Sequence, residues 1–304
     1  SFKDAFTSSP YPKQKTESLV STLKSEGYAT SFFHGAPNGS MGFLGYANIL
    51  GFDHYYGKNE YNNDDDFDGV WGIWDEPFFQ YFNTTISKEK QPFMATLFSV
   101  TSHEPYQVPE KYKGKFPKGD VNIHQCIGYT DFALQQFFAS AKKQPWFKNT
   151  IFVFVGDHGN TIYYDEYKKE MNKNAVAMMI YKPNSKLIGE SAAYAQQIDL
   201  YPTILDLIGY EKPFRSWGRS LVGDKQIQPF VIRYSSNLYQ FMSGSYICTF
   251  DGNKVIGFYA KNDKDLKRNL IAKRNSEMDL IELKCKAYIQ DYMARIMDKK
   301  LAQH

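Results

Sequence analysis

The sequence has few cysteines, no long apolar run and no excess of charge of one sign. Cys126, Cys248 and Cys285 lie far apart without a CxxC pair, which argues against both a zinc site and a disulfide framework. No apolar run approaches the ~18 residues of a membrane span, and no signal peptide opens the chain. The 36 Lys and Arg nearly balance 33 Asp and Glu, so no nucleic-acid partner is indicated. Because Ser1 begins the chain without a targeting segment, we expect a part of a longer protein.

The sequence is long and rich in aromatic residues. Its 304 residues can bury a large core and fit one large α/β domain or two medium ones. There are 23 Tyr and 24 Phe. Aromatic side chains at this density could line a sugar or lipid-head site, but packing is the interpretation we favour.

One stretch, residues 149–160, combines a buried-strand pattern with two polar side chains. Its first half is apolar and rich in β-branched and aromatic residues, and Asp157 and His158 follow between two glycines. Side chains at the carboxyl end of such a strand point into the crevice where open α/β sheets bind ligands. Both residues can ligate a divalent cation. The alternative, a capping Asp and a surface His in a loop, stays open on this evidence.

Two other predicted strands also run into a histidine. Residues 28–33 are followed by His34 and a glycine-rich loop, and residues 92–100 are followed by a loop that contains His103. The carboxyl ends of parallel strands lie on one edge of a sheet, where His34, His103 and His158 could converge. Three such histidines, one of them beside an Asp, predict a polar site.

The remaining pattern predicts an α/β protein with a C-terminal antiparallel part. Pro12 is expected in the first turn of its first helix, and Asp75 is expected to cap another. The expected helices cover residues 12–27, 42–50, 123–143, 197–209 and 279–301, with one more beginning within 71–79. The further strands are expected at 51–56, 151–155, 175–181, 230–234, 239–243, 246–250 and 254–259. The acidic run at 64–68 lacks the spacing of a calcium loop and predicts a solvated loop.

Four motifs in order carry a resemblance to a known family. They are Phe32-Phe-His-Gly35, Thr101-Ser-His-Glu-Pro105, Val155-Gly-Asp-His-Gly159 and Gln197-Ile-Asp-Leu-Tyr-Pro-Thr203. Together they resemble the catalytic domain of lipoteichoic acid synthase-like proteins, in the sulfatase branch of the alkaline phosphatase superfamily, over roughly residues 12–210. The resemblance implies a sandwich with a mostly parallel central sheet in residues 1–218. Residues 219–304 would form a small antiparallel sheet and a closing helix.

The resemblance also implies a metal-dependent transferase or hydrolase of phosphate or sulfate esters. Asp157 and His158 match the family's metal-binding pair, for one divalent cation that is usually manganese, with Mg, Ca or Zn as alternatives. His103 matches the histidine that contacts the phosphate, and it is the candidate catalytic residue. His34 matches a histidine at the rim of the substrate pocket. Asn38 stands in the loop where lipoteichoic acid synthases carry a Trp and an Arg, so it is either a neutral substrate donor or a turn residue.

The chain also departs from the family pattern. The family's metal-binding acid and nucleophilic threonine precede the helix predicted at Pro12, and residues 1–11 do not contain that motif. We therefore expect the nucleophile and half of the metal site upstream, in a protein that acts at the extracytoplasmic face of the membrane on a phospholipid head group or glycan. The present chain would then be inactive by itself, with any membrane attachment lying outside it.

Two alternatives stay open. One is a non-catalytic module that binds an anionic glycan or lipid head group. The other is a two-metal phosphodiesterase or phosphomutase, for which His34 and Asp199 are the only spare ligands.

Overall fold

The computed structural model describes residues 6–222 and 228–302, and the chain forms two compact units. The parallel-sheet unit consists of Ser18–Phe154 and Met178–Lys186. The C-terminal unit consists of Ser1–Glu17, Val155–Ala177 and Leu187–His304. The chain therefore passes between the units more than once. The predicted domain boundary between residues 218 and 219 remains a prediction, because compactness does not show which part folds alone.

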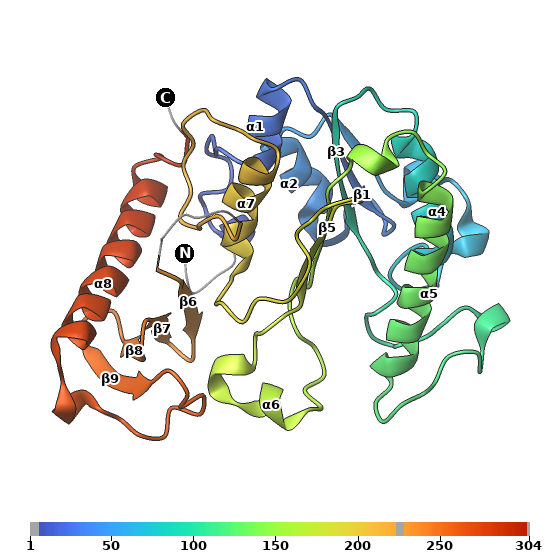
Figure 1. Ribbon diagram of the computed structural model, residues 1–304. Coiled ribbons are helices and arrows are strands. Elements are labelled where there is room, and N and C mark those ends of the chain that lie inside the picture. Colours follow the sequence, from blue (N-terminus) through green and yellow to red (C-terminus); the bar gives the residue numbers. More distant parts are fainter. Residues whose placement is uncertain (1–5, 223–227, 303–304) are drawn as a thin grey trace. The chain divides into compact units, whose positions relative to one another are not determined.

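The parallel-sheet unit alternates strands and helices, as the sequence predicts for an α/β fold (Figure 1). Its helices are α1 (Leu19–Ser25), α2 (Phe43–Leu50), α3 (Lys58–Tyr61), α4 (Asp75–Ile86) and α5 (Ile123–Ala141). Its strands are β1 (Ala29–His34), β2 (His54–Tyr56), β3 (Phe93–Phe98), β4 (Phe152–Val155) and β5 (Met178–Tyr181).

The strand order β2-β1-β3 forms a parallel sheet, and β4 and β5 pair separately. In the register of β1 with β3, His34 lies opposite Phe98. His34 is the last residue of β1, and the loop with His103 starts directly beyond β3, so both histidines lie at the carboxyl edge of neighbouring parallel strands. This confirms the predicted parallel arrangement for these two strands.

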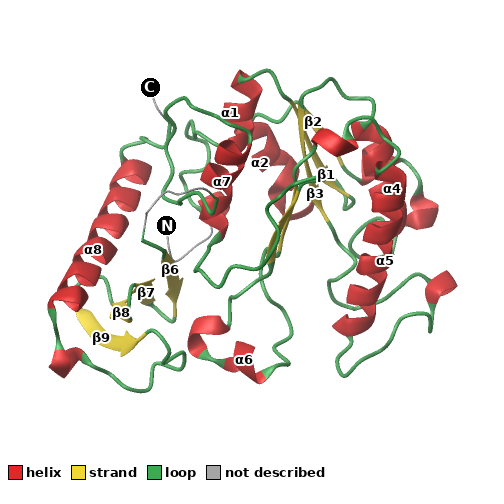
Figure 2. Ribbon diagram, viewed as in Figure 1, coloured by secondary structure: helices red, strands yellow, loops and turns green. Residues whose placement is uncertain are grey.

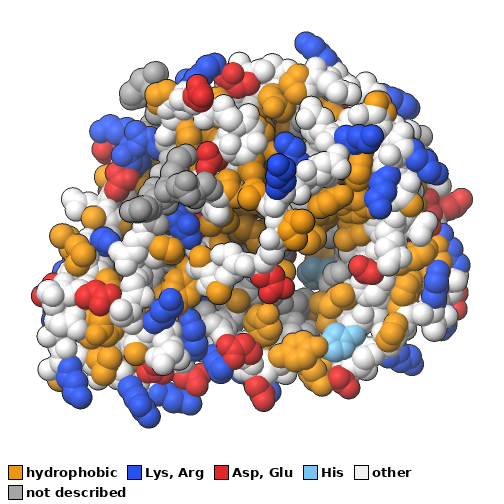
Figure 3. Space-filling model, viewed as in Figure 1, with side chains coloured by type: hydrophobic (Ala, Val, Ile, Leu, Met, Phe, Trp, Pro, Cys, Tyr) orange, Lys and Arg blue, Asp and Glu red, His pale blue; other side chains and the backbone are white. Residues whose placement is uncertain are grey.

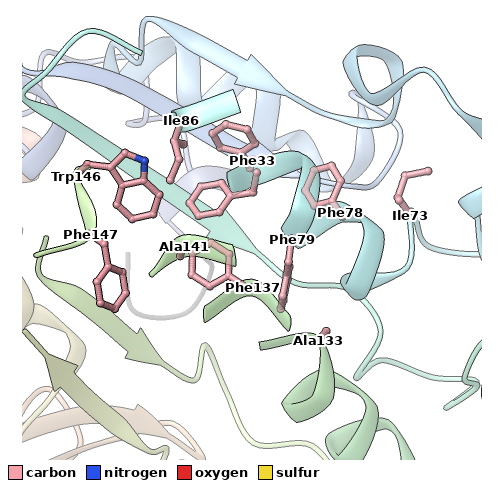
Figure 4. Packing of buried hydrophobic residues seen from close by; sticks show 11 residues of the cluster. Phe33, Ile73, Phe78, Phe79, Ile86, Ala133, Phe137, Ala141, Trp146 and Phe147 are labelled. Carbon is pink, nitrogen blue, oxygen red and sulfur yellow. The ribbon is translucent and has the colours of Figure 1, made fainter. Parts of the chain in front are cut away.

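An aromatic core supports this sheet edge (Figure 4). Phe33 is fully buried, and its ring stacks on Tyr56 with centroids 4.5 Å apart and meets the edge of Phe82 at 4.8 Å. Helices α4 and α5 lie side by side and contribute further apolar side chains to the same cluster (Figure 1). The high aromatic content therefore serves packing in this unit, as we favoured from the sequence.

The C-terminal unit contains the predicted meander and its helix. Its strands β6 (Phe230–Ser235), β7 (Leu238–Ser243), β8 (Tyr246–Phe250) and β9 (Val255–Ala260) pair antiparallel in chain order. Its helices are α6 (Asp165–Lys168), α7 (Leu200–Leu207) and α8 (Ser276–Met297). Helix α8 packs on the meander, where the free thiols of Cys248 and Cys285 are both buried.

Two local predictions are wrong. The first helix begins at Leu19, because the hydroxyls of Ser18 and Ser21 form a reciprocal cap there, and Pro12 lies outside it. Asp75 does not cap α4; the N-cap residue is Trp74, and the Asp75 carboxylate turns toward the loop beyond β3. Figure 2 shows that much of the chain between β3 and α5 is loop. Within the described residues, no helix has the length and apolar character needed to cross a membrane.

Candidate functional site

His103 lies exposed in the loop after β3, against an aromatic wall. Its ring and that of Trp71 have centroids 4.0 Å apart, and Trp71 donates its indole N–H to the carbonyl oxygen of Glu104. Nδ1 of His103 lies 3.3 Å from the same carbonyl oxygen. Together with Trp74 and Thr101, these side chains line a shallow hollow. The hollow therefore combines an imidazole that can donate or accept with apolar ring faces.

The backbone of the Trp71 loop is folded by one carboxylate. Oδ1 of Asp68 accepts hydrogen bonds from the backbone N–H groups of Val70 at 2.8 Å, Trp71 at 2.7 Å and Gly72 at 3.0 Å. A Cβ at Gly72 would lie 2.7 Å from the carbonyl oxygen of Gly35, which is too close for any other residue. Trp71 is thus tied to the segment that follows β1.

His34 ends β1 but is buried, at 3% exposure. Its ring packs edge-on against Phe43 at 4.8 Å and Phe98 at 5.1 Å, and its Nδ1 lies 3.2 Å from the Phe98 carbonyl oxygen. Burial lowers the pKa of His34, and the hydrogen bond with Phe98 opposes that shift only in part. Aromatic rings thus enclose His34, and its expected place at the rim of the substrate pocket, with a role in substrate binding, remains a prediction.

Asn38 lies in the predicted glycine-rich loop, but its side chain is engaged. The amide nitrogen donates to both carboxylate oxygens of Glu60, at 3.0 and 2.9 Å, and the amide oxygen accepts the backbone N–H of Asn59 at 3.4 Å. These contacts attach the loop to α3. A substrate would have to displace Glu60 to reach the Asn38 donor, whose role in binding stays a prediction.

Asp157 and His158 lie in the C-terminal unit, directly beyond β4. Oδ1 of Asp157 accepts the backbone N–H of His158 at 2.8 Å, and Oδ2 lies 3.2 Å from Nε2 of the same histidine. Their side chains are 52% and 65% exposed. The amide of Gln197 donates to the carbonyl oxygens of Gly156 at 2.7 Å and Asp157 at 2.9 Å. Two of the four sequence motifs therefore meet at this loop.

The pair fits a divalent cation in the type of its donors but not in their number. A carboxylate oxygen and an imidazole nitrogen suit Mn²⁺ or Zn²⁺. Among the residues that the structure describes, no group of three or more His, Cys, Asp or Glu side chains is placed to hold a metal ion. Asp157 and His158 can thus form only part of a metal site. The predicted meeting of His158 with His34 and His103 stays a prediction, because the two units are described separately.

Sequence reasoning missed two residues that shape these loops. Gln197 stood inside a quoted motif but was not recognised as the residue that holds the Asp157 loop. Asp75 was recognised only as a cap, although its carboxylate contacts the loop beyond β3. Its partners lie 25 or more positions away in the sequence, so no local pattern points to them.

The surface drawn in Figure 3 agrees with the balanced composition. Basic and acidic side chains are interspersed with apolar ones on that face, without a continuous field of one sign.

Comparison with known proteins places this geometry in context. A family model described as Sulfatase matches residues 2–210. Lipoteichoic acid synthase 2 of Bacillus subtilis (strain 168) is 24% identical over 284 residues, which cover 86% of this chain and 43% of that relative. The chain thus spans less than half the length of this curated relative.

Solved structures confirm the predicted fold class. A protein in the alkaline phosphatase superfamily from Vibrio parahaemolyticus matches with a TM-score of 0.84 and 21% identity, over 99% of this chain and 73% of that chain. The lipoteichoic acid synthase LtaP from Listeria monocytogenes matches with a TM-score of 0.73 and 18% identity, over 94% of this chain and 74% of that chain. At these identities the likeness shows the fold alone.

Proposed function

The chain belongs to the sulfatase family, and from this premise we propose that it is part of an enzyme that transfers or hydrolyses phosphate or sulfate esters. The observation that carries the proposal is the exposed His103 at the carboxyl edge of the parallel sheet, beside Trp71. Ligands of open α/β sheets bind at this edge.

His103 can serve an ester in two ways. Its ring can donate a hydrogen bond to a charged oxygen of the phosphate or sulfate, and it can transfer a proton to the departing alkoxide. The faces of Trp71 and Trp74 offer apolar contact to the carbon skeleton of a head group or sugar ring. This combination supports a substrate with an anionic ester at one end and a polyol or glycan at the other.

Asp157 and His158 are proposed as two ligands of one divalent cation, with manganese as the first expectation and Mg, Ca or Zn as alternatives. A bound cation would neutralise charge on a phosphoryl or sulfuryl oxygen. The described residues supply no third ligand group, and no residue among them is assigned as the threonine nucleophile that the family resemblance implies. We accordingly expect the 304-residue chain to show little turnover by itself.

The named relatives motivate the proposed setting. Several curated relatives are lipoteichoic acid synthases, so we propose an extracytoplasmic phospholipid head group or glycan as the substrate class.

A second candidate is a binding module that holds an anionic head group without converting it. The specific observation in its favour is that only two metal donors come together in the described chain. Chelators would then leave head-group binding unchanged. The two-metal phosphodiesterase or phosphomutase finds no such support, since His34 is buried against Phe98.

The test is an activity measurement on the protein expressed from its complete gene. Phosphodiester and sulfate ester substrates are supplied with Mn²⁺, for the unchanged protein and for His103→Gln. We expect turnover of at least one ester class, abolished by a chelator and strongly reduced in His103→Gln. The matched control is His54→Gln, an exposed histidine of the same unit, which should keep full activity. Binding without turnover under all these conditions would favour the module instead.

A further inference from the structure

Asp75 is an ionisable side chain buried where none is expected. It opens α4 and is 1% exposed, although an acid in the first turn of a helix can remain in water and still interact with the helix dipole. Burial raises the pKa of Asp75, while hydrogen bonds from Val100, Thr130 and Thr101 oppose this shift. A carboxyl group kept in such a place needs compensating contacts.

Those contacts lead to the loop that presents His103. Oδ1 of Asp75 accepts the backbone N–H groups of Val100 at 3.0 Å and Thr101 at 3.3 Å. The backbone N–H of Asp75 donates to Oγ1 of Thr101 at 3.1 Å. Asp75 thereby holds the backbone of two consecutive loop residues and the side-chain hydroxyl of the second, Thr101.

A second branch continues one residue further along the loop. The hydroxyl of Thr130, on α5, lies 2.8 Å from Oδ2 of Asp75 and 3.2 Å from the hydroxyl of Ser102. Val100, Thr101 and Ser102 are the three residues directly before His103. The network therefore ends at the side chain of Ser102, the residue directly before His103.

On its outer side, the same loop is fixed by Trp71. The indole N–H donates to the carbonyl oxygen of Glu104, the residue after His103, and the indole ring contacts the His103 ring. His103 thus lies between two attachments, one buried and one at the surface. Each attachment involves a carboxyl group: Asp75 at the buried one, and Asp68, which accepts the Trp71 backbone N–H, at the surface one.

We propose that Asp75 is the positioning residue of the His103 hollow, acting through the Val100 and Thr101 backbone and through the Thr130–Ser102 hydroxyl pair to keep His103 against Trp71. This role rests on the function proposed above only in one respect, namely that the hollow receives the ester substrate. Asp75 itself is not a catalytic residue, because it lies behind the loop.

Substitutions that keep or remove these hydrogen bonds can distinguish an effect on the position of His103 from an effect on the stability of the protein. Asparagine at this position can accept the two backbone N–H groups with its oxygen and donate to Thr130 with its nitrogen. Alanine can do neither. At Thr130, serine keeps the hydroxyl and valine removes it at nearly the same volume.

The test measures the contact between Trp71 and His103 by fluorescence in the protein expressed from its complete gene. A protonated imidazole quenches the fluorescence of an adjacent indole. The protein is acidified, and its fluorescence change is compared with that of His103→Gln. The part of the change that is lost in His103→Gln reports the contact. We expect the His103-dependent change to be lost in Asp75→Ala and reduced in Thr130→Val. It should be retained in Asp75→Asn and Thr130→Ser. In the same series kcat/KM should fall about 10- to 100-fold for Asp75→Ala, because small displacements of a reacting group cost rates of this order.

The outcomes separate the two proposals. A folded Asp75→Ala protein with unchanged His103-dependent quenching overturns the positioning role. If Asp75→Ala does not fold, equal quenching in Thr130→Val and Thr130→Ser overturns it instead. The predicted quenching pattern in a protein that neither binds nor converts any ester would uphold the positioning role and refute the proposed function.

Discussion

The His103 loop and the Asp157 loop carry two of the four sequence motifs, but their contacts in the fold differ. The residues before His103 are bound to a buried carboxyl group, and His103 itself rests on Trp71. Asp157 and His158 are about half exposed or more and contact mainly each other, with Gln197 on their backbone. The first loop is attached to a buried carboxyl group, whereas the exposed second loop is held at its backbone by Gln197.

The difference matches what each loop is proposed to bind. A histidine that must meet a substrate in one orientation gains from a rigid support. Two metal ligands acquire their final orientation when a cation binds, so a looser loop suffices for them. The comparison therefore predicts that substitutions in the two loops divide differently between activity and stability.

The largest effect on activity is expected at Asp157 and His158. Replacing either with Ala removes a proposed metal ligand, and this loss should lower activity by at least ~100-fold, the upper limit found when a residue that only orients a ligand is replaced. Because both side chains are exposed, the unfolding free energy should change by no more than about 0.5 kcal/mol. Metal-dependent ester turnover and urea unfolding of the complete protein measure the two quantities. Full activity in both variants would remove the metal proposal.

The next effect is expected at Gln197. Gln197→Glu keeps the length of the side chain but loses the amide donors to Gly156 and Asp157. Since Gln197 would orient the proposed ligand Asp157 without touching the cation, the apparent Mn²⁺ affinity should fall about 10-fold. Titration of activity with Mn²⁺ measures the shift. The neighbouring Gln196 serves as control, because its amide contacts Phe230 and Ile232 instead; an equal shift in Gln196→Glu would show that the effect is not specific.

A smaller effect is expected at Trp71. Trp71→Phe keeps an aromatic face but removes the hydrogen bond to Glu104, a loss of about 1 kcal/mol or roughly 5-fold in head-group affinity. Binding calorimetry with a glycerol phosphate measures it. The control is the buried Trp146, whose indole N–H donates to Ser87. Trp146→Phe should lower the stability of the protein and leave its head-group affinity unchanged. A loss of affinity in Trp146→Phe but not in Trp71→Phe would contradict the proposal that the hollow beside Trp71 binds the head group.

The smallest effect concerns pH and His34. Burial places the pKa of His34 below its ordinary value of 6.5, so His34 binds a proton more readily in the unfolded chain than in the folded one. The stability contributed by neutral His34 is present above that value and is lost as pH falls through it. His34→Gln should flatten this part of the curve of unfolding free energy against pH, while His54→Gln should not. An unchanged slope in His34→Gln would show that His34 is not the titrating group.

The sequence predicted the strands better than it predicted where the first helix begins. The patterns before His34, His103 and His158 identified three strands, because runs of apolar β-branched and aromatic residues have a strong local signal. The expected burial is wrong for two of them: β3 is only partly buried, and so is β4, where Val155 is 40% exposed. The start of α1 was missed because the Ser18–Ser21 cap outweighs the preference of Pro12 for a first turn.

The candidate site was predictable in its residue types but not in its contacts. Asp75 meets Val100 and Thr130 only through tertiary packing, and Asn38 meets Glu60 in the same way. His34 was predicted at a rim, but the aromatic rings of Phe43 and Phe98 cover it. Local periodicity contains no information on such long-range pairs, so these roles became visible only in the structure.

His103 and Trp71 are proposed to form the surface that receives the ester. The most direct measurement is a nuclear magnetic resonance titration that follows the His103 imidazole and the Trp71 indole N–H while glycerol phosphate or a sugar sulfate is added. We expect saturable shifts of both signals with at least one ester, and no shift of the His54 imidazole. Binding that leaves His103 and Trp71 unchanged while other residues respond would contradict it.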